Sequence, residues 1–323
     1  MQPMLPDERR LGAHLPLGLG MVKAVDRANA IGANAIQVFA DNPTAWRRRM
    51  DPPRELPDFR QRLSDLAIGP VAIHASYLVN LAGPDEGFYP KSIEVLASEL
   101  RAAPGFRARF VNVHVGSHRG SGTQAGTERL AEGLRLALAE VDHDPDAAAV
   151  VLENSAGGGF GLGVDVPELA GIAEVAAAKG VPDTRLAFCL DTAHAWGAGI
   201  DLADPDATDA FLDEFDARIG LRRLVMVHLN DSKSELGSHL DRHEHLGAGR
   251  IGARGLGHLL RHPRLAHAAF YLETPGMDEG YDAVNMARAL DLLAGRPLAD
   301  LPPEAMNLRG SRARTPPAED ADA

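Results

Sequence analysis

The chain has 323 residues, of which 45% are hydrophobic, which is enough for a sizeable core and ordinary for one α/β barrel. Its formal net charge of -12 argues against non-specific binding of nucleic acid, because phosphate contacts need Lys and Arg. The single cysteine, Cys189, excludes a disulfide framework within the chain and indicates a reducing cytoplasm. Neither a signal peptide nor a membrane span is expected, because no apolar run follows the first charges or approaches about 18 residues.

Short apolar runs recur along the chain at intervals that suit one strand and one helix each. These runs lack the alternation of a half-exposed strand, so we expect strands that are buried on both faces. Eight such strands are predicted, at residues 10–16, 35–40, 70–75, 109–115, 149–154, 185–191, 223–230 and 268–273.

The segments between the strands are rich in Ala, Leu, Arg and Glu with helical periodicity, most clearly at 20–33, 91–103, 126–142, 166–180 and 281–294. Eight strands that alternate with helices predict a single (β/α)8 TIM barrel over residues 1–297. A doubly wound open sheet is the alternative, which the eight repeats disfavour. From residue 298 to 323 the sequence is rich in Pro and charge without periodicity, so we expect a largely disordered tail.

Potential metal ligands stand at the ends of successive predicted strands. In a barrel the carboxyl ends of all strands open onto one rim, where the active site is built. We therefore expect nine side chains to converge on one mouth: His74, His114, Glu153, Asp191, His194, His228, Asp241, His243 and Glu273.

Each of these residues taken alone has a simpler structural explanation, such as a hydrogen-bonded histidine or a barrel-mouth ion pair. That explanation would have to hold nine times on the same rim, so a metal site is favoured. Four carboxylates in one cleft would repel one another without cations. A mixed set of imidazoles and carboxylates without a thiolate suits zinc and tolerates manganese. Nine ligands divide into three sites, which predicts a cluster of about three zinc ions. The remaining histidines, His258 and His262 among them, are expected to be surface or supporting groups.

Around these residues the sequence resembles the endonuclease IV family of abasic-site endonucleases. The resemblance runs from the third strand to the eighth in the family's order, and its longest motif extends from His228 to Gly252. The matching stretches are HASYLVNLAGP at 74–84, HVGSHRGSG at 114–122, LENSAGGG at 152–159, CLDTAHAWGAGID at 189–201, HLNDSKSELGSHLDRHEHLGAGRIG at 228–252 and LETP at 272–275.

The resemblance implies a trinuclear zinc site and hydrolysis of double-stranded DNA on the 5′ side of abasic sites, leaving a 3′-hydroxyl. It assigns His74, His114 and Glu153 to the first zinc. The second zinc takes Glu153, Asp191, His228 and Glu273, and the third takes His194, Asp241 and His243. Glu153 and Glu273 are expected to be catalytic: both position the attacking water, and Glu273 takes its proton. Tyr77 matches the tyrosine that lines the abasic-sugar pocket.

The sequence departs from the family after the second strand. Thr44 stands where family members carry an arginine that enters the DNA stack. Arg47, Arg48 and Arg49 follow and are candidates to replace it, or form a solvated turn. Lys233 and Arg242 are expected to contact substrate phosphates.

Two other functions remain open. Glu153, Asp191, His228 and Glu273 would also serve a sugar isomerase or epimerase of the xylose-isomerase-like type, although that reading leaves His74 and His114 unexplained. The protein could instead be a DNA-damage binder that has lost efficient cleavage. We expect a cytoplasmic monomer that does not contact membranes.

Overall fold

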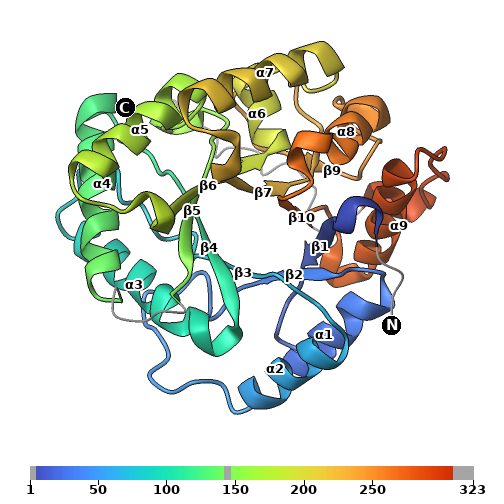
Figure 1. Ribbon diagram of the computed structural model, residues 1–323, viewed down its shortest axis with the longest axis horizontal. Coiled ribbons are helices and arrows are strands. Elements are labelled where there is room, and N and C mark those ends of the chain that lie inside the picture. The colour runs from blue at the N-terminus through green and yellow to red at the C-terminus, as the bar shows by residue number, and fades with distance from the viewer. Residues whose placement is uncertain (1–4, 142–146, 308–323) are drawn as a thin grey trace, which may run out of the picture.

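Eight parallel strands close into a barrel in the computed structural model, which describes residues 5–141 and 147–307 (Figure 1). Around the barrel the strands follow the order β1-β10-β7-β6-β5-β4-β3-β2, and β2 pairs with β1 to close it. All eight predicted strands are confirmed, with bounds β1 Arg10–His14, β2 Ala35–Val38, β3 Val71–His74, β4 Ala108–His114, β5 Ala149–Glu153, β6 Leu186–Asp191, β7 Leu224–His228 and β10 Ala269–Leu272. The prediction of a (β/α)8 barrel is therefore confirmed.

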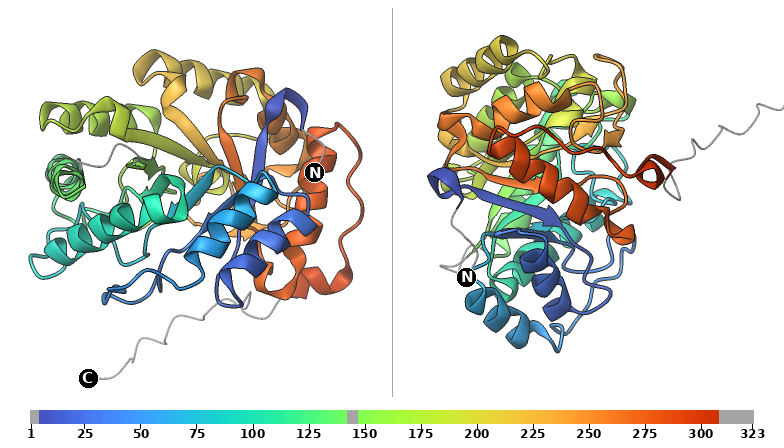
Figure 2. Two further views of the ribbon diagram at one scale, coloured as in Figure 1. Left: turned by 60° about the horizontal axis from the view of Figure 1, so that its bottom comes forward. Right: turned by 90° about the vertical axis from the view of Figure 1, so that its right-hand side faces the viewer.

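Helices surround the barrel on its outside, as the turned views show (Figure 2). Five of them correspond to the predicted segments: α1 Met21–Ala30, α3 Tyr89–Phe106, α4 Thr123–Ala139, α5 Val166–Ala178 and α9 Tyr281–Leu293. The predicted end of α4 at residue 142 lies outside the described residues. Three further helices belong to this layer: α2 Leu56–Asp65, α7 Pro205–Arg218 and α8 Gly252–Arg261. The short helix α6 Thr192–Ala198 follows β6 directly and packs against the loop after β7.

The strands are buried on both faces, which explains why their sequences do not alternate. Their outward side chains join those of the helices in one large apolar cluster. Their inward side chains fill the barrel with a second, smaller cluster that includes Phe110, Cys189, Met226 and Tyr271. The barrel interior is thus a packed core, so its strands can contribute to a site only at their ends.

Close approach between β1 and β2 depends on Gly12. A Cβ atom at this position would lie 2.1 Å from the carbonyl oxygen of Ala35, which is far inside van der Waals contact. Gly12 pairs in register with Ala35, and two residues further along the strands His14 pairs with Gln37. The absence of a side chain at Gly12 therefore sets how closely His14 and Gln37 approach at the mouth.

A short antiparallel ribbon, β8 Asp231–Ser232 with β9 His243–Glu244, shapes the loop after β7. The buried carboxylate of Asp231 accepts hydrogen bonds from the backbone N–H groups of Gly247, Gly249 and Ile251 at 2.9–3.0 Å. This one side chain ties both ends of the loop together, so the residues between them are held over the barrel mouth.

The segment predicted as a tail begins with ordered structure. Residues 303–307 form a 3-10 helix, and the buried Ala305 accepts a hydrogen bond from the His245 ring through its carbonyl oxygen. This contact ties residues 303–307 to the loop after β7, and residues 308–323 lie outside the described residues. Within the described parts of the chain, no helix has the length and apolarity required to span a bilayer.

Candidate metal centre

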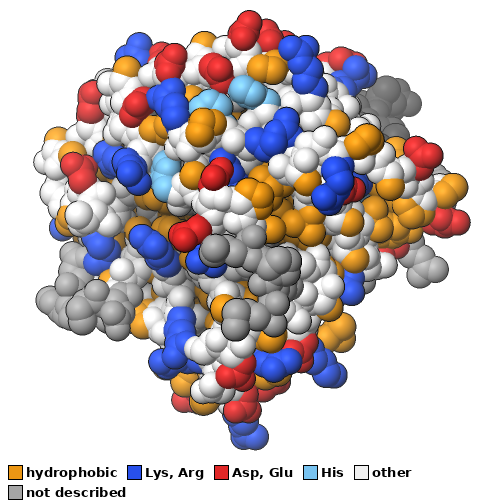
Figure 3. All heavy atoms as spheres, turned by 45° about the vertical axis from the view of Figure 1, so that its right-hand side comes forward, with side chains coloured by type: hydrophobic (Ala, Val, Ile, Leu, Met, Phe, Trp, Pro, Cys, Tyr) orange, Lys and Arg blue, Asp and Glu red, His pale blue; other side chains and the backbone are white. Residues whose placement is uncertain are grey.

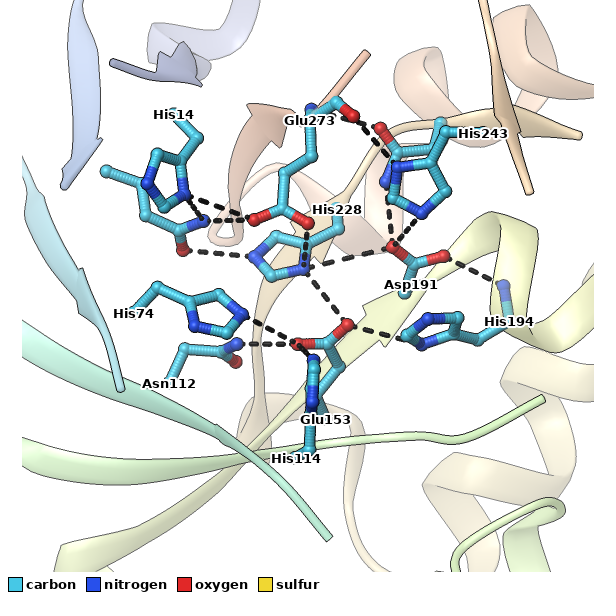
Figure 4. A network of polar contacts seen from close by, with 12 residues as sticks. His14, His74, Asn112, His114, Glu153, Asp191, His194, His228, His243 and Glu273 are labelled. Carbon is cyan, nitrogen blue, oxygen red and sulfur yellow. Dashed lines mark hydrogen bonds and ion pairs between the residues drawn. The ribbon is translucent and has the colours of Figure 1, made fainter. Parts of the chain in front are cut away.

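The nine predicted ligands converge on the carboxyl-terminal mouth of the barrel, and Figure 4 labels all of them except Asp241. The strand register accounts for the convergence. His114 at the end of β4 pairs with Glu153 at the end of β5, and Asp191 at the end of β6 pairs with His228 at the end of β7. Ligands that lie far apart in the sequence are therefore neighbours on the rim.

The first group joins His74 and His114 to Glu153. Their Nε2 atoms lie 3.7 Å and 3.6 Å from the same oxygen of Glu153, Oε2. The three ligand atoms all lie within 4.8 Å of one another. This separation is suitable for one ion between two imidazoles and one carboxylate.

The second group is formed by Glu153, Asp191, His228 and Glu273, again within 4.8 Å. The Nδ1 atom of His228 is central, at 3.3 Å from Glu153 and from Glu273 and 3.9 Å from Asp191. Glu153 contributes to both groups, one oxygen to each, so its carboxylate is placed to bridge two ions.

The third group brings His194 and His243 together with two aspartates. Asp241 lies 3.2 Å from Nε2 of His194 and 3.1 Å from Nε2 of His243. Asp191 also lies within reach of both imidazoles. Asp191 is therefore shared between the second and third groups.

Hydrogen bonds on the far side of each ring orient the imidazoles toward the carboxylates. The backbone carbonyls of Ala75, Asn154 and Glu273 accept from Nδ1 of His74, His194 and His243, at 2.7–2.9 Å. A donating N–H at one ring nitrogen leaves the lone pair of the other for a metal, which is the usual arrangement around metal-binding histidines.

Three atoms at the centre of the site are buried without a hydrogen-bond partner: Oε1 of Glu153, Nδ1 of His228 and Nε2 of His243. Buried polar atoms are rarely left without a partner, because each costs about 1–3 kcal/mol. Divalent cations among the three groups would satisfy all three atoms. The residues present therefore fit a metal cluster of the zinc type.

The electrostatics of the metal-free site also favour added positive charge. Burial opposes protonation of His243, but Asp191 and Asp241 overcome it and raise the pKa to about 9. Against the effect of burial, the pKa of His194 is raised well above its ordinary value by Asp191, Asp241 and Glu153. The pKa of His228 is likewise raised well above its ordinary value, by Cys189, Glu273 and Glu153. Protons on these imidazoles supply charge that cations would otherwise bring. His74, where burial dominates, instead has its pKa lowered to about 4.

The two predicted catalytic carboxylates are held ionised. Burial opposes ionisation of Glu153, yet His228 and His114 hold its pKa well below the usual range. Burial is likewise outweighed at Glu273, whose pKa is lowered chiefly by His228 and by the hydrogen bond with His14. Both groups are therefore proton acceptors rather than donors at neutral pH.

Several supporting residues were not predicted from the sequence. The fully buried amide of Gln37 donates to Glu273 at 2.6 Å, and its oxygen lies 3.0 Å from Nε2 of His228. Asn112 donates to Glu153 at 2.6 Å, and Asn230 donates to Asp191 at 2.7 Å. For Gln37 and Asn112 the available signal was a polar residue inside a mostly apolar strand, whereas Asn230 follows the end of β7.

The predicted substrate-binding residues surround the metal ligands. The ring of Tyr77, which is 58% exposed, lies 5.6 Å from the ring of His74 and 6.3 Å from that of His114. The exposed Lys233 and Arg242 are joined by a backbone hydrogen bond across the β8–β9 ribbon, and Lys233 also lies 3.7 Å from Glu244. Tyr77 therefore lies beside two of the candidate metal ligands, and Lys233 and Arg242 lie next to the ribbon that carries His243.

The three arginines that follow Thr44 differ in how exposed their side chains are. The guanidinium of Arg48 is buried and forms an ion pair with the buried Glu99, so it is removed from the candidates for DNA contact. Arg47 and Arg49 are exposed. Thr44 is exposed as well, and its backbone N–H and hydroxyl both donate to the Asn42 side chain in a local turn.

A closed parallel barrel with metal-binding residues at its carboxyl-terminal mouth defines the class of xylose-isomerase-like TIM barrels, and the family of that description matches residues 25–295. Within this class, the chain belongs to the endonuclease IV family. It is 37% identical to "Probable endonuclease 4" of Halothermothrix orenii over 86% of this chain and 99% of the relative. It is 39% identical to the protein of the same name from Methanoculleus marisnigri over 87% and 98%.

Solved structures agree with this assignment. The crystal structure of endonuclease IV from Thermus thermophilus superposes with a TM-score of 0.76 at 39% identity, covering 88% of this chain and 99% of that one. A D-tagatose 3-epimerase-like protein shares the fold with a TM-score of 0.63 at 15% identity, over 88% and 97% of the two chains. The second likeness concerns the fold alone.

Proposed function

We propose that this protein is a DNA-repair endonuclease that hydrolyses the phosphodiester on the 5′ side of abasic sites, using three zinc ions held by the nine-residue centre. Membership of the endonuclease IV family supports the general assignment as a DNA-repair endonuclease. The observation that supports three metal ions is the set of three ligand groups that share Glu153 and Asp191. Cleavage on the 5′ side of abasic sites is proposed from the resemblance to the endonuclease IV family.

Zinc bound at these groups would lower the pKa of a bound water and neutralise the charge of a phosphate. The protein's own contribution follows from its contacts. Glu153 and Glu273 lie on either side of His228 and are held ionised, so Glu273 is placed to accept the proton of the attacking water. Gln37 and Asn112 fix the orientation of these carboxylates.

The exposed side chains at the mouth would bind the substrate. Tyr77 offers an aromatic face beside His74 and His114 for an extruded abasic sugar, which costs little to unstack. Lys233 and Arg242 offer positive charge to the flanking phosphates. On the face drawn in Figure 3, which looks toward the amino-terminal ends of the strands, basic side chains are interspersed with acidic ones. Phosphate binding at the mouth, on the opposite end of the barrel, would depend on local basic groups and on the metals.

Cleavage of a duplex with a single abasic site, compared with an intact duplex, tests the proposal. The expected result is nicking of the abasic duplex only, with a 3′-hydroxyl at the cut, and loss of nicking in Glu273→Gln. Glu174→Gln, an exposed glutamate on α5, is the matched control and should retain full activity. Full activity of Glu273→Gln would contradict the role of this carboxylate.

A sugar isomerase or epimerase is the second candidate, because Glu153, Asp191, His228 and Glu273 lie within 4.8 Å of one another as that chemistry requires. It gives no role to the first group, in which His74 and His114 share an oxygen of Glu153. Turnover of ketose sugars without nicking of abasic DNA would favour it.

A further inference from the structure

A second cluster of metal-binding side chains lies on the outer layer of helices. Asp209 on α7 faces His258 on α8 and His262, the residue that ends α8, and their ligand atoms lie within 4.8 Å of one another. The two helices lie side by side outside the barrel (Figure 1). Among the described residues, no hydrogen bond or ion pair joins this cluster to the nine residues of the barrel mouth.

We propose that Asp209, His258 and His262 form a separate binding site for a divalent transition metal of the zinc class. The two histidines are four residues apart, so they share one face of the helix. Asp209 approaches that face from the neighbouring helix. Two imidazoles and one carboxylate suit zinc, and a half-exposed carboxylate leaves the site open to solvent.

The geometry points both rings at a single atom. Oδ1 of Asp209 lies 2.6 Å from Nε2 of His258 and 3.3 Å from Nε2 of His262. With metal–ligand bonds of the length usual for zinc, ligand atoms of a tetrahedral site are separated by about 3.3 Å. The pair of Asp209 and His262 already has this spacing. The shorter contact with His258 requires only a small movement of the half-exposed Asp209 side chain.

His262, the more buried of the two histidines, is held in place by its backbone. His262 is 9% exposed, and its carbonyl oxygen accepts a hydrogen bond at 2.7 Å from the buried Arg9. The Nδ1 atom of its ring is buried without a hydrogen-bond partner, and the ring faces Asp209 through Nε2, which is the nitrogen that would bind the metal once it releases its proton. The nearby cation Arg264 is engaged with Asp213 and Asp216 rather than with Asp209. The carboxylate of Asp209 therefore remains for a metal.

A metal at this site would link α7 to α8. A metal that binds the folded chain and not the unfolded one raises the free energy of unfolding, by an amount that grows with the logarithm of the metal concentration. The site would act as a metal-dependent clamp between two helices, independent of the proposed activity at the barrel mouth.

The test is zinc content at equilibrium, measured by mass spectrometry of protein dialysed against a series of buffered Zn²⁺ concentrations. The wild type should bind one equivalent more than His258→Ala and Asp209→Asn. His267→Ala is the matched control, because this exposed histidine contacts the Leu221 carbonyl and belongs to neither metal-binding cluster, so the variant should keep the extra equivalent. The thermal midpoint should rise with added Zn²⁺ more in the wild type than in His258→Ala.

Nicking of abasic DNA should be unchanged in His258→Ala, which separates this site from the one at the barrel mouth. Equal zinc contents in the wild type, His258→Ala and Asp209→Asn would overturn the proposal and leave a hydrogen-bonded cluster without a metal. Loss of the extra equivalent in His267→Ala as well would also overturn it, because it would indicate non-specific binding to surface histidines.

Discussion

Replacing Gln37 with leucine should weaken the metal centre without removing any ligand. The buried amide contacts Glu273 at 2.6 Å, His228 at 3.0 Å and His14 at 3.1 Å. Leucine has a similar size but forms no hydrogen bonds, so it leaves Oε1 of Glu273 and Nε2 of His228 with fewer or no partners.

Oε1 of Glu273 keeps its contact with His14 at 3.3 Å, whereas Nε2 of His228 loses its partner. One buried polar atom left unpaired costs about 1–3 kcal/mol. Part of this cost appears as lower stability and part as weaker metal binding. Loss of a residue that orients metal ligands lowers metal affinity or activity by roughly 10–100-fold, so we expect a decrease of this size in Gln37→Leu.

Zinc affinity, measured by competition with a chromophoric chelator, and the rate of abasic nicking at saturating zinc check this expectation. Gln124→Leu on the exposed face of α4 is the matched control and should change neither quantity. Wild-type zinc affinity together with wild-type nicking in Gln37→Leu would refute the orienting role of the amide.

Three other outcomes are expected. Burial raises the pKa of Glu99 from 4.5 to about 7, so between these pH values the folded protein holds a proton that the unfolded chain releases. The free energy of unfolding should therefore fall by roughly 3 kcal/mol as the pH rises from 4.5 to 7. Urea unfolding of Glu99→Gln should lack this dependence on pH. If Arg242 contacts a phosphate, Arg242→Ala should reduce the salt dependence of binding to abasic DNA by about one ion, whereas Arg254→Ala, exposed on α8, should not. Gly12→Ala places a Cβ 2.1 Å from the Ala35 carbonyl oxygen and should cost about 1–3 kcal/mol or more in urea unfolding; wild-type stability would show that β1 can move away from β2.

The sequence was sufficient to predict the barrel, because strands buried on both faces and the helices between them leave a repeating apolar pattern. It also predicted that nine side chains would meet, since parallel strand ends share one rim and the ligands stand at those ends. The observed register places His114 beside Glu153 and Asp191 beside His228, as that reasoning requires.

Contacts that depend on packing between distant elements could not be predicted. Arg48 looked available for DNA, and only the approach of Glu99 from α3 shows that its guanidinium is buried. The i, i+4 spacing of His258 and His262 was visible in the sequence, but nothing in it placed Asp209 opposite them. The 3-10 helix at residues 303–307 could not be predicted either, because it is held by a hydrogen bond from His245, which lies 60 residues before Ala305 in the sequence.

The most direct test of the account is a zinc titration of the metal-depleted protein, with bound zinc and cleavage of an abasic duplex followed in the same samples. His258→Ala provides the background for this titration, because it lacks the proposed outer site. The account predicts that cleavage appears as three zinc ions bind, always on the 5′ side of the abasic site, and that an intact duplex is not cut. Full cleavage with one zinc bound, or no cleavage with three, would contradict it.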